Sequence, residues 1–205
     1  MEKIRLADTK PHFVILYGLR GIAAIMVLIF HIFEIHGFQD SIYIIGHGYL
    51  AVDFFFVLSG FVIGYAYDDR WTKMSFFSFI KRRIIRLQPM VILGTILGGI
   101  LFYFGFSSVF PLIGETPVWK MLLYLLLGML LIPVPPSMDI RGWKEMYTLD
   151  APCWSPFFEY IANILYGLFI RKFTKTALFI LVFLSGLATL YLSLTQGNVN
   201  GGWEF

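Results

Sequence analysis

Five apolar stretches, each about long enough to cross a lipid bilayer, dominate this chain and constrain its fold. A transmembrane helix needs about 20 mostly apolar residues. The predicted spans cover residues 14–35, 49–67, 89–106, 154–170 and 177–195. Because backbone groups inside lipid must be hydrogen-bonded within the protein, such stretches form helices. We therefore predict an all-α, polytopic transmembrane helix bundle.

The composition agrees with a membrane protein. Hydrophobic residues make up 58% of the 205 positions and charged residues 14%, against about 25% charged in a soluble domain. The basic residues lie beside apolar stretches, which argues against nucleic-acid binding. Cys153 is the single cysteine, so no disulfide can form within the chain, and no metal-site spacing occurs.

The N-terminus allows two interpretations. Lys3, Arg5 and Lys10, followed by the apolar residues 21–33, resemble a signal peptide. No small-residue cleavage site follows, however, which favours an uncleaved first span. The basic residues then place the N-terminus in the cytoplasm. We expect a multi-pass protein of the plasma (inner) membrane.

The segment near 118–134 decides the number of spans. Its apolar core, 121–132, is only twelve residues long, which suits a re-entrant or interfacial segment better than a span. Five spans would put the cations of 171–175 in the cytoplasm, and six would put them outside. Both arrangements stay open, with five preferred, and a loop is expected at 135–152.

Two ionisable residues stand out in the first span. Arg20 and His31 are eleven positions apart, which on an α-helix places them within roughly 20° of one another, on one face. Such groups are costly in lipid and mark functional sites. An imidazole can serve as a general base for proton or acyl transfer. Alternatively, Arg20 anchors the span and His31 is hydrogen-bonded in the bundle. Glu34 could orient the imidazole or face the headgroups.

A second pair, Arg83 and Arg86, lies in the densest cationic patch of the chain, residues 81–86. Arginines three positions apart on a helix could clamp phosphate groups. The alternative is that they only mark the cytoplasmic side. Residues 75–87 are predicted to form an interfacial helix, with the next span beginning at Pro89.

Three further residues are candidates because of where they lie in the spans. Asp53 is the only charge in the second span, near its outer end, and Glu159 lies about one turn into a span whose entry is marked by Trp154. A carboxylate at such a place could orient a cation or a histidine. The alternatives are an interface residue for Asp53 and a buried ion-pair partner for Glu159.

Four motifs in this order resemble the membrane-bound acyltransferase-3 family. They are LRGIAAIMVLIFH (19–31), YLAVDFFFVLSGFVI (49–63), FIKRRIIRLQP (79–89) and WSPFFEY (154–160). Arg20 and His31 match the family's basic-x10-His pattern, and Arg83 and Arg86 match its Arg-x-x-Arg pattern. Pro156 stands where the family's Trp-Ser-Leu has leucine. The resemblance covers the family's N-terminal half, so residues 1–205 are expected to form one acyltransferase-like domain without the family's C-terminal spans.

The resemblance implies an integral-membrane O-acyltransferase. Such an enzyme transfers an acyl group, commonly acetyl, from a cytoplasmic acyl-CoA to a hydroxyl of a cell-surface or secreted glycan, and no metal is expected. His31 would be the general base or a transient acyl carrier, and Arg20 would guide the donor or stabilise negative charge. Glu159 is placed with them in the catalytic set, while Arg83 and Arg86 would contact the phosphates of CoA.

A second function from another class stays open. The chain could be a truncated, non-catalytic membrane binding or transport component that pairs with another subunit, since the resemblance stops at the family's N-terminal half.

Overall fold

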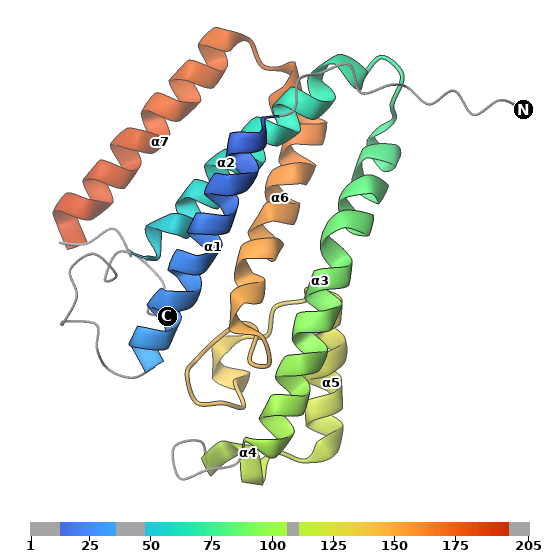
Figure 1. Cartoon of the computed structure of the whole chain (residues 1–205), viewed down its shortest axis with the longest axis vertical. Coiled ribbons are helices and arrows are strands. Elements are labelled where there is room, and N and C mark those ends of the chain that lie inside the picture. The colour runs from blue at the N-terminus through green and yellow to red at the C-terminus, as the bar shows by residue number, and fades with distance from the viewer. Residues whose placement is uncertain (1–12, 36–47, 106–110, 197–205) are drawn as a thin grey trace, which may run out of the picture. The chain divides into compact units, whose positions relative to one another are not determined.

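The computed structural model describes residues 13–35, 48–105 and 111–196 (Figure 1). Across these ranges the regular structure is helical and no strand occurs, which confirms the predicted all-α class. The chain divides into two compact units, residues 1–68 and 69–205.

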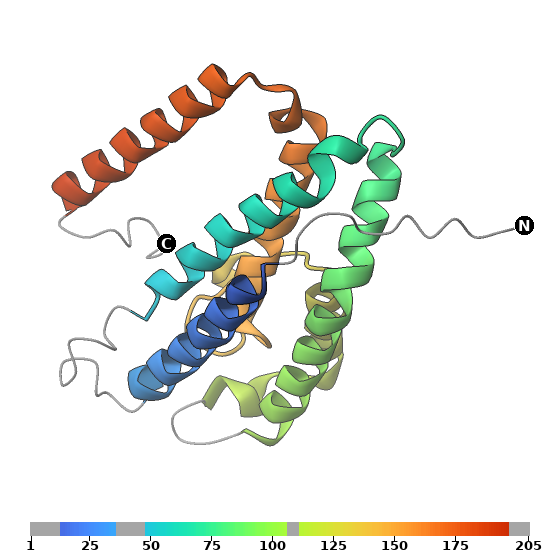
Figure 2. The ribbon, with the colours of Figure 1, turned by 45° about the horizontal axis from the view of Figure 1, so that its top comes forward.

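The first unit is an antiparallel pair of helices, α1 (Val14–Ile35) and α2 (Leu50–Tyr67). Figure 2 shows the two ribbons side by side. The ring of Phe13, before α1, lies 5.2 Å from that of Tyr65 near the end of α2. Both helices are long and apolar enough to cross a membrane. Their bounds agree with the predicted spans to within a residue.

The second unit is organised around α3 (Phe76–Phe104), a helix of 29 residues. The side chain of Ser75 accepts a hydrogen bond from the backbone N–H of Ser78 (3.2 Å), which caps the start of the helix. At 1.5 Å per residue α3 is about 44 Å long, against a hydrocarbon core of about 30 Å. The helix is therefore long enough to extend beyond the bilayer core.

The predicted boundary at Pro89 is wrong. Pro89 lies inside α3, so residues 75–87 and the following span form one continuous helix and not two. A proline in a helix removes one backbone hydrogen bond and crowds the preceding turn. Contacts with other helices on both sides of Pro89, through Arg83 and Val91, hold the helix together here.

Helix α5 (Val118–Met129) follows the one-turn helix α4 (Pro111–Glu115) and runs antiparallel to the C-terminal half of α3 (Figure 1). It ends beside the middle of α3, where a Cβ on Gly128 would overlap the side chain of Thr95. There the chain reverses through Leu131, whose φ of 53° is left-handed, and the N–H of Ile132 donates to Leu127 (2.9 Å). With 12 residues, α5 is shorter than a membrane span.

Residues 130–153, which include the loop expected at 135–152, pack against α3 and α5. The hydroxyl of Tyr124 donates to the carbonyl of Met138 (2.6 Å), and the N–H of Val134 donates to that of Met146 (2.9 Å). A buried cluster joins the segment to both helices: Phe102, Ile113, Tyr124, Val134, Ile140 and Leu149.

Helix α6 (Trp154–Leu168) runs antiparallel to the N-terminal half of α3, with Gly167 close to the rings of Phe76 and Phe79. Pro156 is its third residue. Backbone N–H groups in the first turn have no helical acceptor, so a proline there is tolerated and α6 starts at Trp154. With 15 residues, α6 is shorter than the four helices of span length in the described residues, where five spans were predicted.

Helices α5 and α6 both pack against α3, the first along its C-terminal half and the second along its N-terminal half. A short turn, Ile170–Lys172, then leads to α7 (Lys175–Gln196), the last predicted span. In this turn the guanidinium of Arg171 lies 4.2 Å from the ring centroid of Trp71, which precedes α3. Since the ring of Trp71 lies 5.2 Å from that of Phe79, Arg171 lies near the N-terminal end of α3.

Candidate functional site

In the first unit, Arg20 and His31 lie on one uninterrupted helix, α1. The one-face relation predicted for them requires such a helix. Arg20 is half-buried and His31 is exposed. Glu34 belongs to α1, but its side chain lies outside the described residues. Asp53 is exposed in the first turn of α2, where a negative charge is favoured by the helix dipole.

In the second unit, Arg83 of α3 and Glu159 of α6 form an ion pair between the two helices. Arg83 Nη2 lies 2.6 Å from Glu159 Oε1, and the side chains are 3% and 24% exposed. A guanidinium this deeply buried needs a charged partner, and Glu159 provides one. Glu159 is thus the ion-pair partner of Arg83, with its own side chain only partly buried.

The two arginines of the Arg-x-x-Arg motif lie in different surroundings. Arg83 is buried, whereas Arg86 is exposed. Arg83 belongs to a buried stripe of α3 that faces other elements of the unit: Phe79, Arg83, Val91, Thr95, Gly99 and Phe102. Residues of this stripe are three, four or eight positions apart, the spacing of one helix face. Arg86 lies off the stripe.

A second polar contact joins α3, α5 and α6 through Gln88. Its amide oxygen accepts a hydrogen bond from the hydroxyl of Tyr160 (2.9 Å). Its amide nitrogen donates to the carbonyl of Met129, the last residue of α5. Carbonyls at a helix C-terminus lack helical donors, so Gln88 satisfies an acceptor at the point where the chain reverses.

Two further residues of α6 make contacts inside the unit. Asn163 is fully buried, and its side-chain amide donates to the backbone carbonyl of Glu159 (2.6 Å). Trp154 packs against a buried cluster that includes Val91 and Tyr147.

Gln88, Tyr160 and Asn163 are not among the candidates identified from the sequence. Their polarity could have pointed to them, because a polar side chain in an otherwise apolar membrane helix needs a partner. For Gln88, however, the sequence does not identify the partners, which lie 41 and 72 positions away in the chain.

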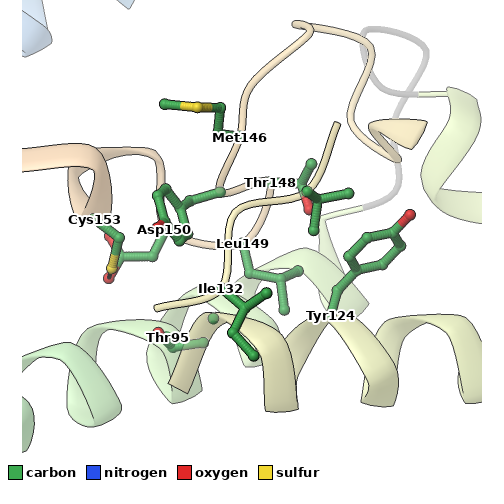
Figure 3. A pocket seen from close by; sticks show the side chains of 11 residues that line it. Thr95, Tyr124, Ile132, Met146, Thr148, Leu149, Asp150 and Cys153 are labelled. Atoms are coloured by element: carbon green, nitrogen blue, oxygen red, sulfur yellow. Dashed lines mark hydrogen bonds between the residues drawn. The ribbon is translucent and has the colours of Figure 1, made fainter. Parts of the chain in front are cut away.

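A small cavity lies between α3, α5 and the segment that returns from α5 (Figure 3). Thr95, Tyr124, Thr148 and Cys153 are among the residues that line it. Its volume of about 10 Å³ is close to the minimum for one water molecule, so it is too small for a substrate.

The thiol of Cys153 donates to Asp150 Oδ2 (3.2 Å). The pKa of Cys153 is raised to about 12, mainly because the thiol is buried and secondly because the carboxylate of Asp150 lies nearby. Because the thiolate is the reactive form, Cys153 is unsuited to act as a nucleophile near neutral pH. In the described part of the chain, no group of three or more His, Cys, Asp or Glu side chains could hold a metal ion.

Comparison with known proteins bears on what this arrangement does. The family described as "Acyltransferase domain" matches residues 14–205. "Protein 2 in picA locus" of Rhizobium radiobacter is 29% identical over 174 residues, 79% of this chain and 85% of that protein. "Acyltransferase MdmB" of Streptomyces mycarofaciens is 28% identical over 170 residues, 78% of this chain and 40% of that protein. No solved structure matches the chain significantly.

Proposed function

The chain belongs to the acyltransferase family whose domain matches residues 14–205, and we propose that it is an integral-membrane O-acyltransferase. The donor is a cytoplasmic acyl-CoA, with acetyl the expected acyl group, and the acceptor is a hydroxyl of a cell-surface or secreted glycan. Residues 1–205 act as one acyltransferase-like domain in the plasma membrane, with the N-terminus in the cytoplasm.

The observation that supports this proposal best is the placement of Arg20 and His31 on one uninterrupted helix of membrane length, inside the matched domain. The helix rises about 16 Å between them. A cation and an imidazole at these two depths suit a reaction in which an acyl group moves from one side of the membrane toward the other.

In this reaction His31 removes the proton from the acceptor hydroxyl. The oxygen attacks the thioester carbonyl, the carbon–sulfur bond breaks, and the departing CoA sulfur takes the proton from the imidazolium. Arg20 lies about 16 Å from His31 along the helix, too far to contact the same carbonyl oxygen, so its role here is to guide the donor. If His31 is instead a transient acyl carrier, its nitrogen attacks the thioester first and the acceptor hydroxyl then removes the acyl group.

The phosphates of the donor bind at the cationic start of α3, where the Arg-x-x-Arg motif lies. A family described by acyl transfer is compatible with an acyl donor of this kind. Since CoA is a water-soluble polyanion, its phosphates need cations at the membrane surface and not within the hydrocarbon core.

The proposal is tested in cells that lack other glycan O-acyltransferases. Surface and secreted glycans are collected from cells that express the wild-type chain, the His31→Ala variant or no chain, and ester-linked acetate is released with alkali. We expect acetate above background only with the wild-type chain. Equal acetate in all three samples would contradict the enzymatic proposal and favour a non-catalytic binding or transport component that pairs with another subunit.

A further inference from the structure

We propose that the phosphate-binding pair of α3 is Arg82 with Arg86, and that Arg83 instead ties α3 to α6. This assigns a binding role to Arg82, which the Arg-x-x-Arg pattern leaves out. The identity of the anion, the phosphates of an acyl-CoA, rests on the proposed function.

The first step concerns Arg83, which is not available to a soluble ligand. It lies on the buried stripe of α3, four positions after Phe79, and these residues are 2% and 0% exposed. Its guanidinium is 2.6 Å from the carboxylate of Glu159. A phosphate could reach it only by displacing this carboxylate and separating α3 from α6, which would leave Glu159 without its cation.

The second step concerns the geometry of the two arginines that remain. Arg82 and Arg86 are both exposed and lie four positions apart, about 40° around the helix, with Cβ atoms about 5–6 Å from one another. Like charges at this spacing repel, and an anion between them relieves the repulsion. Two planar guanidinium forks on one helix face suit a diphosphate, because each can bind two oxygens.

The third step concerns depth in the membrane. The last twenty residues of α3, 85–104, span about 30 Å, the thickness of the hydrocarbon core. If they fill the core, Arg86 lies at its boundary and Arg82 about one turn beyond it. A water-soluble nucleotide can approach both positions.

The fourth step concerns rigidity. Arg86 lies between Arg83 and Gln88 along α3, and both of these are fixed to α6, the first by Glu159 and the second by Tyr160. Arg82 directly precedes Arg83. The part of α3 that carries Arg82 and Arg86 is therefore held in place before a ligand arrives, which lowers the entropy cost of binding.

The test measures the affinity of the purified full chain for acetyl-CoA. We expect Arg82→Ala and Arg86→Ala each to weaken binding about tenfold, the effect of losing roughly one charge-assisted contact, and the corresponding lysine variants to retain part of the affinity. Lys81→Ala is the matched control. It removes one exposed positive charge from the same turn, on a different side of the helix, and should change binding less than about threefold. If Arg82→Ala behaved like Lys81→Ala, the proposal would be overturned.

A second measurement needs no variant. The wild-type chain is treated with phenylglyoxal, which modifies accessible arginines, and its peptides are analysed by mass spectrometry with and without CoA. We expect Arg82 and Arg86 to be modified, CoA to protect both, and Arg83 to stay unmodified throughout. Modification of Arg83 that CoA prevents would contradict the proposal.

The two proposals can fail separately. Protection of Arg82 and Arg86 by CoA, without any acyl transfer, would leave the anion site standing and remove the enzymatic function. Acyl transfer by a chain in which CoA protects neither arginine would keep the enzyme and remove this site.

Discussion

Arg83 and Glu159 are 76 positions apart in the chain, yet Arg83 Nη2 and Glu159 Oε1 lie 2.6 Å from one another. This ion pair fixes how α3 and α6 sit together. It also explains why an arginine occupies a stripe position that an apolar side chain would otherwise fill.

The first prediction concerns the stability of this pair. Glu159→Ala leaves the Arg83 guanidinium buried without its carboxylate, a change that typically costs about 3–5 kcal/mol. Because the Glu159 side chain is 24% exposed, we expect a loss near the lower end of that range. The measurement is reversible unfolding of the purified chain in mixed micelles.

A double variant provides the control. Arg83→Met with Glu159→Met removes both charges and fills similar volume, so it should be more stable than Glu159→Ala alone. A double variant less stable than Glu159→Ala would contradict this description of the pair.

The second prediction concerns Gln88. Gln88→Leu leaves both the Met129 carbonyl and the Tyr160 hydroxyl without the partners described here, and it should lower the free energy of unfolding by about 1–3 kcal/mol. Tyr160→Phe removes one of these bonds and should cost about 1 kcal/mol. Tyr103→Phe, at an exposed tyrosine of α3, is the control and should change the free energy of unfolding little. The same unfolding assay measures these losses of stability. A larger loss for Tyr160→Phe than for Gln88→Leu would contradict the two contacts described for Gln88.

The third prediction concerns the close approach of the returning segment to α3. A Cβ on Gly98 would overlap the backbone carbonyl of Leu149, so Gly98→Ala must move backbone and should cost about 1–3 kcal/mol, as overpacking typically does. Gly186→Ala is the matched control, since nothing lies within 4 Å of its Cβ position and alanine favours a helix. Unfolding midpoints of the two variants test this; a Gly98→Ala protein as stable as Gly186→Ala would contradict the packing.

The predictable part of the fold was set by local sequence. Helices α1, α2 and α7 were predicted because each is an uninterrupted apolar stretch of span length. The short apolar core, 121–132, likewise predicted that this part of the chain falls short of span length, and α5 has 12 residues. None of these inferences requires knowledge of which elements touch.

What was missed depends on contacts between distant residues. Local rules end a helix near Pro89, but contacts of α3 with α6 on both sides of the proline keep it continuous. The segment 130–153 has no periodic pattern, and its order comes from Gly98, Tyr124 and the cluster around them. At the candidate site, the residue types were predicted, but the pairing of Arg83 with Glu159 was not.

The fourth prediction concerns the reactivity of Cys153. Burial and the Asp150 carboxylate raise its pKa from 9.0 to about 12, which lowers the thiolate fraction at pH 8 by about a thousandfold. The folded chain should therefore react with a maleimide far more slowly than the chain unfolded in SDS. Rapid labelling of the folded chain at pH 8 would contradict this environment.

The same pKa shift has a consequence for stability. The folded state favours the protonated thiol. The contribution of this preference to the free energy of unfolding is therefore complete below pH 9 and is lost as the pH rises toward 12. Asp150→Asn removes one of the two main causes, and it should increase the rate of labelling of the folded chain.

The fifth prediction is the most direct test of the central claim, that this chain transfers acyl groups through His31. Membranes that contain the chain as their only acyltransferase are supplied with acetyl-CoA labelled in the acetyl group and with a hydroxyl-bearing glycan. We expect label on the glycan with the wild-type chain and with His47→Ala, a histidine to which no role is assigned. With His31→Ala we expect at least a hundredfold less label, the low end of what a general base contributes. Undiminished transfer by the His31→Ala chain would show that His31 is not the catalytic base.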